Sequence, residues 1–68
     1  MEKDWQLVCT AKSVIEAEMK RGILESAGLE PIVMNKQDSS YLFGDVEVYV
    51  SKEQFERAVE TLKNADNE

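Results

Sequence analysis

The sequence predicts a small α+β domain with the element order β-α-β-β-α. Apolar and polar residues alternate in the segments at residues 5–10 and 45–50, and a period of two is typical of strands. Apolar residues recur every three to four positions after Ser13 and again after Ser51, which is typical of amphipathic helices. The 68 residues form one domain at most, ordered from about residue 5 to residue 63, with a frayed tail at residues 64–68.

The first strand is predicted at residues 5–10, with the sequence WQLVCT. Trp5, Leu7 and Cys9 occupy alternate positions and would share one face of the strand, with Cys9 as a buried, unreactive thiol. Val8 would lie on the opposite face. An apolar residue at that position indicates that both faces of the strand are partly covered.

The first helix is predicted from about Val14 to Ala27. Ser13 is a candidate N-cap, because Glu16 stands three residues later in the capping-box pattern. Gly28 fits the left-handed position that follows a helix. The residues that recur at helical spacing, and that we expect to face the core, are Ile15, Met19, Gly22, Ile23 and Ser26. The charged side chains of the helix then point mostly outward.

Gly22 lies within this helix, where glycine costs about 1 kcal/mol relative to alanine. Two interpretations of this glycine are open. The first is a close approach of the helix to the sheet or to Trp5. The second is a smooth contact point for another subunit or a ligand.

Two further strands and a second helix follow. The strand PIVMN, residues 31–35, begins with Pro31, which suits the first residue of a strand or a sheet edge. The strand DVEVYV, residues 45–50, places three valines on one face and Asp45, Glu47 and Tyr49 on the other. Ser51 and Gln54 form a second capping-box pattern. The helix after them has the apolar stripe Phe55, Ala58, Val59 and Leu62.

Two helices with one apolar stripe each can cover only one face of a three-stranded sheet. A right-handed crossover makes the first strand parallel to the second across the first helix, and the third strand pairs between them in the order 1-3-2. This is the split βαβ, ferredoxin-like plan without its last strand, and we expect a mixed sheet. The first strand, with Trp5 and Val8, is left as an open edge.

The composition argues against several classes of function. The net charge of −6 disfavours nucleic acid and anionic membranes as partners, and no apolar run is long enough to span a bilayer. The chain has no His and one Cys, so we expect neither a metal site, nor an intrachain disulfide, nor enzymatic activity. No Gly-rich phosphate cradle is present, and we expect no cofactor. The free thiol and the absence of a signal sequence predict a cytoplasmic protein.

Two regions are candidates for interaction with a protein partner or with another copy of the chain. Tyr41, Leu42 and Phe43 form an apolar triplet in a polar loop, either as a contact patch or as residues that pack over the end of the core. The second region is the open sheet face, where we expect Tyr49 with Val8 and Val33. Asn35 ends a strand and is either a turn residue or a weak candidate for binding a small ligand.

Residues 16–35, EAEMKRGILESAGLEPIVMN, resemble the core signature of DUF2007, a family of small bacterial signal-transducing domains. The later segment GDVEVYVSKEQFERAVETL is similar to the second half of that family, and the resemblance covers about Leu7 to Leu62. It implies a ferredoxin-like fold related to the PII-type nitrogen regulators, which are trimeric nucleotide sensors. In those regulators the loop between the second and third strands contacts partner proteins. The matching residues are Glu16, Glu18, Gly22-Ile23-Leu24, Ala27-Gly28 and Asn35.

The sequence therefore predicts a small non-enzymatic regulatory or interaction module. It would act through the loop between the second and third strands or through the open sheet face. The alternative is a PII-like sensor that holds a small metabolite between subunits.

Overall fold

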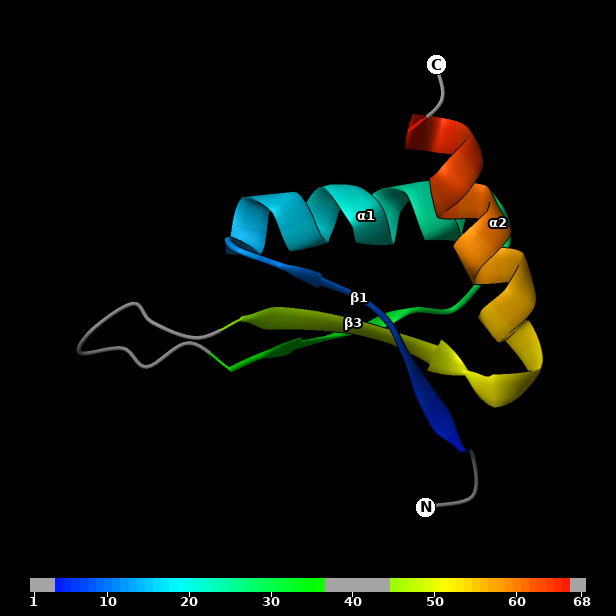
Figure 1. Cartoon of the computed structure of the whole chain (residues 1–68), viewed down its shortest axis with the longest axis horizontal. Helices are drawn as coiled ribbons and strands as arrows, with labels where there is room; N and C mark the ends of the chain where they lie inside the picture. The colour runs from blue at the N-terminus through cyan, green and yellow to red at the C-terminus, as the bar shows by residue number, and fades with distance from the viewer. Residues whose placement is uncertain (1–3, 37–44, 67–68) are drawn as a thin grey trace.

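The computed structural model describes residues 4–36 and 45–66, and its element order confirms the prediction (Figure 1). The fold is α+β, with three strands and two α-helices. The elements are β1 (Trp5–Ala11), α1 (Val14–Ser26), β2 (Ile32–Asn35), β3 (Val46–Ser51), the 3-10 turn η1 (Lys52–Gln54) and α2 (Phe55–Asp66).

The sheet has the order β1-β3-β2, so β3 is central as expected. Both of its hydrogen-bonded pairs are antiparallel. The sheet is therefore antiparallel, and the expectation of a mixed sheet is wrong in this detail. β1 and β2 run parallel to each other, but they lie on either side of β3 and do not pair. The split βαβ arrangement itself is confirmed.

Both helices lie on the same side of the sheet, and the core fills the space between the two layers (Figure 1). β3 supplies the centre of this core, because its three valines are fully buried and alternate along the strand. The core is thin, as expected for so short a chain. Its buried apolar residues in the described part of the chain are Ala11, Ala17, Leu24, Leu29, Val46, Val48, Val50, Ala58 and Leu62.

The ends of α1 have the predicted caps. The Ser13 hydroxyl accepts a hydrogen bond from the Glu16 backbone N–H at 3.2 Å. At the other end Gly28 adopts φ +85°, and the Leu29 backbone N–H donates to the Leu24 carbonyl at 3.1 Å. This pattern is a Schellman motif, in which the buried side chains of Leu24 and Leu29 cover the helix end.

The predicted apolar stripe of α1 is wrong. The helix buries Ala17 and Leu24, whereas Ile15 and Met19 are 76% and 65% exposed. Of that stripe, only Ile23 packs against the core. Both sets of residues repeat at helical spacing, so periodicity alone could not select the inner one.

The second helix begins later than expected and continues further. Ser51 makes no side-chain cap, because η1 occupies residues 52–54 before α2 starts, so the second capping box is wrong. Ala58 and Leu62 are buried and Phe55 packs against the core, which confirms most of the predicted stripe, while Val59 is 40% exposed. The helix reaches Asp66, within the tail that we expected to fray.

α2 is attached to the end of α1 by a hydrogen bond between side chain and backbone. Arg57 Nη2 donates to the Ala27 carbonyl at 2.7 Å, at the C-terminal end of α1. A cation at this end is favourable, because the last carbonyls of a helix lack partners within it. The contact links α2 to the C-terminal end of α1.

Candidate protein interface

The face of the sheet away from the helices carries a set of apolar side chains. Along β3 the valines point to the core, and Glu47 and Tyr49 alternate with them on the opposite side, where both are half-buried. Residues directly across an antiparallel pair share a face. The strand register therefore shows which residues of β1 and β2 lie beside Tyr49.

Three strands contribute to one apolar row. Leu7 and Ile32 are both register partners of Tyr49, one from each neighbouring strand. The next row contains Thr10, Glu47 and Met34, and on the other side of Tyr49 the residue Trp5 is paired with Ser51. We call this surface the open sheet face, and its apolar members are Trp5, Leu7, Ile32, Met34 and Tyr49.

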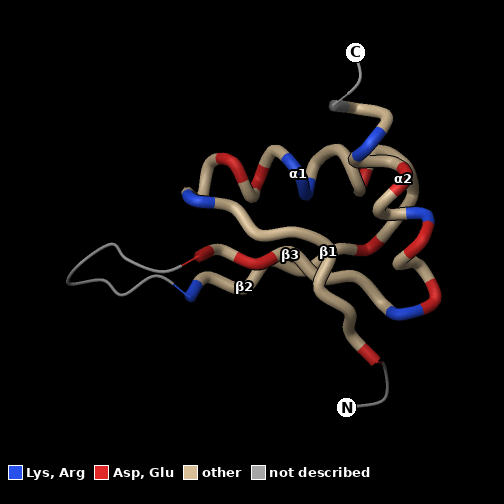
Figure 2. The backbone as a smooth tube through the Cα atoms, in the orientation of Figure 1, with Lys and Arg blue, Asp and Glu red and all other residues tan. Residues whose placement is uncertain are grey.

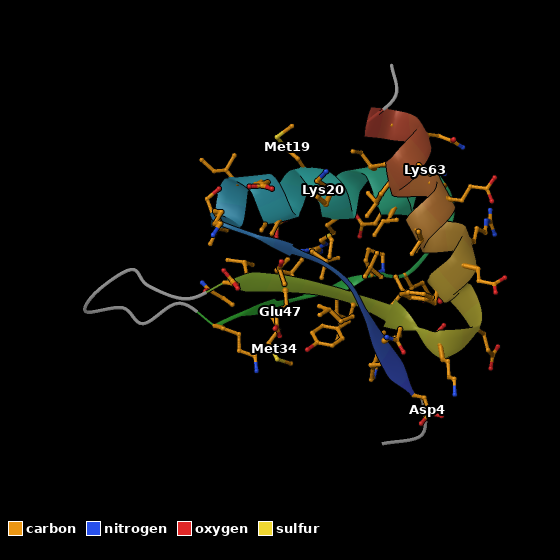
Figure 3. The ribbon with its side chains drawn as sticks, in the orientation of Figure 1. Asp4, Met19, Lys20, Met34, Glu47 and Lys63 are labelled. Atoms are coloured by element: carbon orange, nitrogen blue, oxygen red, sulfur yellow. The ribbon has the colours of Figure 1, made fainter. Side chains whose placement is uncertain are left out.

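The apolar members of this face are accessible from outside the chain. Leu7 is 37% exposed, Ile32 38% and Met34 43%, and both α-helices lie on the other side of the sheet. Figure 3 shows Met34 and Glu47 on the side of the sheet away from α1. Contiguous exposed apolar side chains of this kind mark interaction surfaces when they are bordered by polar residues.

The predicted composition of this face is only partly right. Tyr49 lies on it as expected, but Val8 and Val33 pack against the core. The register of β1 shifts between Leu7 and Cys9, which is a β-bulge at Val8 that ends the simple alternation. Cys9, expected beside Trp5 and Leu7, is instead the partner of the core residue Val48.

Charged groups lie at one end of the open sheet face. The Tyr49 hydroxyl donates a hydrogen bond to Glu47 Oε1 at 2.8 Å, and Lys36 Nζ lies 3.9 Å from the same oxygen. Figure 2 shows positive charge at the end of β2 and negative charge around the start of β3, whereas β1 between its ends carries no charge. The hydrogen bond to Glu47, with burial and the carboxylate's charge, raises the pKa of Tyr49 above its ordinary value.

Trp5 closes the other end of the face. Its indole N–H is buried and has no hydrogen-bond acceptor in the part of the chain that is described. A buried donor without a partner costs about 1–3 kcal/mol. Sequence periodicity could not reveal this feature, because it depends on the tertiary surroundings of the indole.

The remaining candidate residues are not brought into this face. Tyr41, Leu42 and Phe43 lie outside the described residues, so their prediction stays open. Asn35 is the last residue of β2, is exposed and pairs with Val46. It therefore has the strand-end position that the sequence predicts, and its role as a ligand contact stays a prediction.

The described residues contain little else that could hold a ligand. None of their His, Cys, Asp or Glu side chains form a group of three or more that could bind a metal ion. A shallow hollow of about 440 Å³ runs along α2, lined by Phe55, Glu56, Val59, Glu60, Lys63 and Asn64. All six residues come from one helix, so the hollow is open to solvent. No helix in residues 4–36 and 45–66 is long and apolar enough to cross a membrane.

Comparison with protein families decides where the chain belongs. Residues 5–66 match the model of DUF2007, described as "Putative prokaryotic signal transducing protein". The chain belongs to the DUF2007 family. The match spans β1 to α2, and it supports a role in regulation at a coarse level. No match was found among curated proteins or among solved structures.

Proposed function

We propose that this DUF2007 chain is a non-enzymatic regulatory module of the cytoplasm that forms a homodimer through its open sheet face. The observation that carries the proposal is the row of Leu7, Tyr49 and Ile32, which crosses all three strands without a covering helix. The description of the family supports a signalling role. The absence of His removes the usual general base near neutral pH and favours binding over catalysis.

A second copy of the chain is the occupant that the charge distribution favours. Lys36, Asp45 and Glu47 gather at one end of the face, and the apolar rows occupy its middle and other end. Two copies related by a two-fold axis can overlap their apolar rows while the charged ends lie outside the contact, at opposite ends. An isologous interface requires this kind of self-complementarity.

The small core supplies a second reason for self-association. Chains of this size are commonly stabilised by disulfides, metals or oligomerisation. One Cys cannot form an intrachain disulfide, and the described residues offer no cluster for a metal. Packing the open faces together would add a second apolar layer next to the fully buried valines of β3.

The expected dimer has two sheets face to face with helices outside. Packed sheets lie about 10 Å apart, with their side chains interdigitated. The open sheet face is narrow, because it has three strands about 4.8 Å apart. Its area is therefore smaller than the roughly 800 Å² that a standard interface buries on each partner. We therefore expect a dimer that dissociates on dilution.

The proposal is tested by measuring solution mass with light scattering across a wide concentration range. In the variant Leu7→Glu, the face-to-face contact would bring a carboxylate into the apolar row of each copy, and we expect a folded monomer. The control is Val59→Glu, because Val59 on α2 is 40% exposed and Leu7 is 37% exposed. Circular dichroism confirms that both variants are folded.

Two outcomes would contradict the proposal. One is a wild-type chain that stays monomeric at every concentration. The other is a dimer that Val59→Glu dissociates and Leu7→Glu does not. Melting curves with added ATP test the PII-like alternative in the same samples, because a ligand that binds the folded state raises the Tm with its concentration.

A further inference from the structure

A second exposed apolar surface lies on α1. Among the described large apolar residues that are exposed, Ile15 and Met19 are the most so, at 76% and 65%. Gly22 and Ser26 continue the same line at helical spacing and are also exposed. We call these four residues the outer α1 strip. Figure 3 shows Met19 on the side of α1 away from the sheet, opposite to Met34.

Contacts among the described residues do not account for the strip. A Cβ placed on Gly22 would meet no atom of the described residues within 4 Å, so close packing among them does not require a glycine there. Glycine is also among the poorest helix formers. The Ser26 hydroxyl donates to the carbonyl of Gly22 at 2.8 Å and lies 3.1 Å from that of Ile23, so its hydrogen bonding is already satisfied. The strip thus presents two large apolar side chains followed by two small, smooth positions.

We propose that the outer α1 strip binds an amphipathic helix of a partner protein whose apolar stripe is bordered by basic residues. Small residues on one helix let a second helix approach closely, at the interaxial distances of 8–10 Å seen in packed helices. A large side chain of the partner fits over Gly22, while Ile15 and Met19 pack into the partner's grooves.

The charges on one border of the strip favour a basic partner, whereas on the other border the charges of Glu16 and Lys20 offset each other. Glu18 and Glu25 lie along one border, and Arg21 is 3.4 Å from the first and 3.5 Å from the second. Two half-exposed carboxylates therefore share one guanidinium, which leaves this border negative. The whole chain carries −6, and this charge adds attraction for a basic partner over a longer range.

The same charges disfavour a second copy of the chain at this strip. A two-fold axis between antiparallel α1 helices would place the border of Glu18 and Glu25 beside its own copy. Like charges facing each other across an interface oppose binding. The strip and the open sheet face lie on opposite sides of the molecule, so a homodimer would expose two strips (Figure 3). The proposal does not depend on that dimer.

The probe for the experiment is a fluorescent synthetic peptide of about five helical turns, with a leucine stripe and lysine borders. Its control has glutamate in place of every lysine. We expect anisotropy titrations with the full chain to show binding of the lysine peptide only, weakened by salt. Met19→Ser should raise the Kd at least about tenfold, which corresponds to 1.4 kcal/mol. Gly22→Leu should do the same without loss of helix, since leucine is a good helix former.

Matched variants separate this site from the open sheet face. Leu7→Glu should leave peptide binding unchanged. Equal binding of the two peptides, or a Kd that neither Met19→Ser nor Gly22→Leu changes, would overturn the proposal. Loss of binding in Leu7→Glu alone would move the peptide site to the open sheet face. Self-association that Met19→Ser abolishes would instead assign the strip to a second copy.

Discussion

Tyr49 lies in the middle of the open sheet face, and its hydroxyl donates a hydrogen bond to the Glu47 carboxylate. We expect Glu47→Gln to lower the pKa of Tyr49 toward its ordinary value, because the substitution removes the carboxylate that accepts the hydrogen bond and repels the tyrosinate. Ultraviolet titration in a Tyr41→Phe background measures this, because Tyr49 is then the only tyrosine. An unchanged titration curve would show that the hydrogen bond does not persist in solution.

The same pair sets how stability depends on alkaline pH. The folded-state pKa of Tyr49 is raised, so the folded chain holds this proton more tightly than the unfolded chain does. Its contribution is complete below the unfolded pKa of about 10 and is lost as the pH rises through the folded-state pKa. In Glu47→Gln this loss of stability above pH 10 should be smaller.

Alanine substitutions at Gly22, within α1, and at Gly28, in its C-terminal cap, should change the free energy of unfolding in opposite directions. Gly22→Ala should stabilise the fold by up to about 1 kcal/mol, because the site is helical and its surroundings are open. Gly28→Ala should cost about 1–2 kcal/mol, because φ is +85° there. Urea unfolding of both variants measures the difference. Effects of the same sign would contradict the described cap or the open surroundings of Gly22.

The helix α1 turns the face that carries Leu24 toward the sheet and leaves the face that carries Ile15 exposed. Leu24→Ala should cost about 2–5 kcal/mol, because Leu24 is fully buried. Ile15→Ala should change stability by about 0.5 kcal/mol or less, because Ile15 is 76% exposed. Thermal or urea unfolding decides between the two faces. A larger cost for Ile15→Ala would restore the stripe that the sequence pattern favours.

The elements that the sequence predicts well have local causes. Ser13 and Gly28 mark the ends of α1 by chemistry that acts within one turn, and the alternation of β3 follows from one covered face. The bulge at Val8 does not follow from the local sequence, because the shift in β1 depends on its pairing with β3. For the same reason the sequence predicts an open apolar face with Tyr49 on it, but not that the other apolar members of this face are Trp5, Leu7, Ile32 and Met34.

Residues 4–36 and 45–66 form a two-layer sandwich in which one sheet face has no helix over it and α1 has an exposed apolar strip on the opposite side. The bare face follows from element count, since two helices can cover only one side of three strands. The strip could not be predicted, because the helical period fits both sides of α1 and only the packing of Leu24 and Ala17 chooses between them. The proposed dimer and the proposed helix partner therefore use separate surfaces.

The most direct test of the open sheet face is an isotope-filtered NOE measurement on a mixture of labelled and unlabelled chains. It records contacts between two copies and no contacts within one. A dimer formed through the open sheet face should give intermolecular contacts between the Tyr49 ring and the methyl groups of Leu7 and Ile32. Intermolecular contacts confined to Ile15 and Met19, or none at concentrations where the dimer should form, would contradict it.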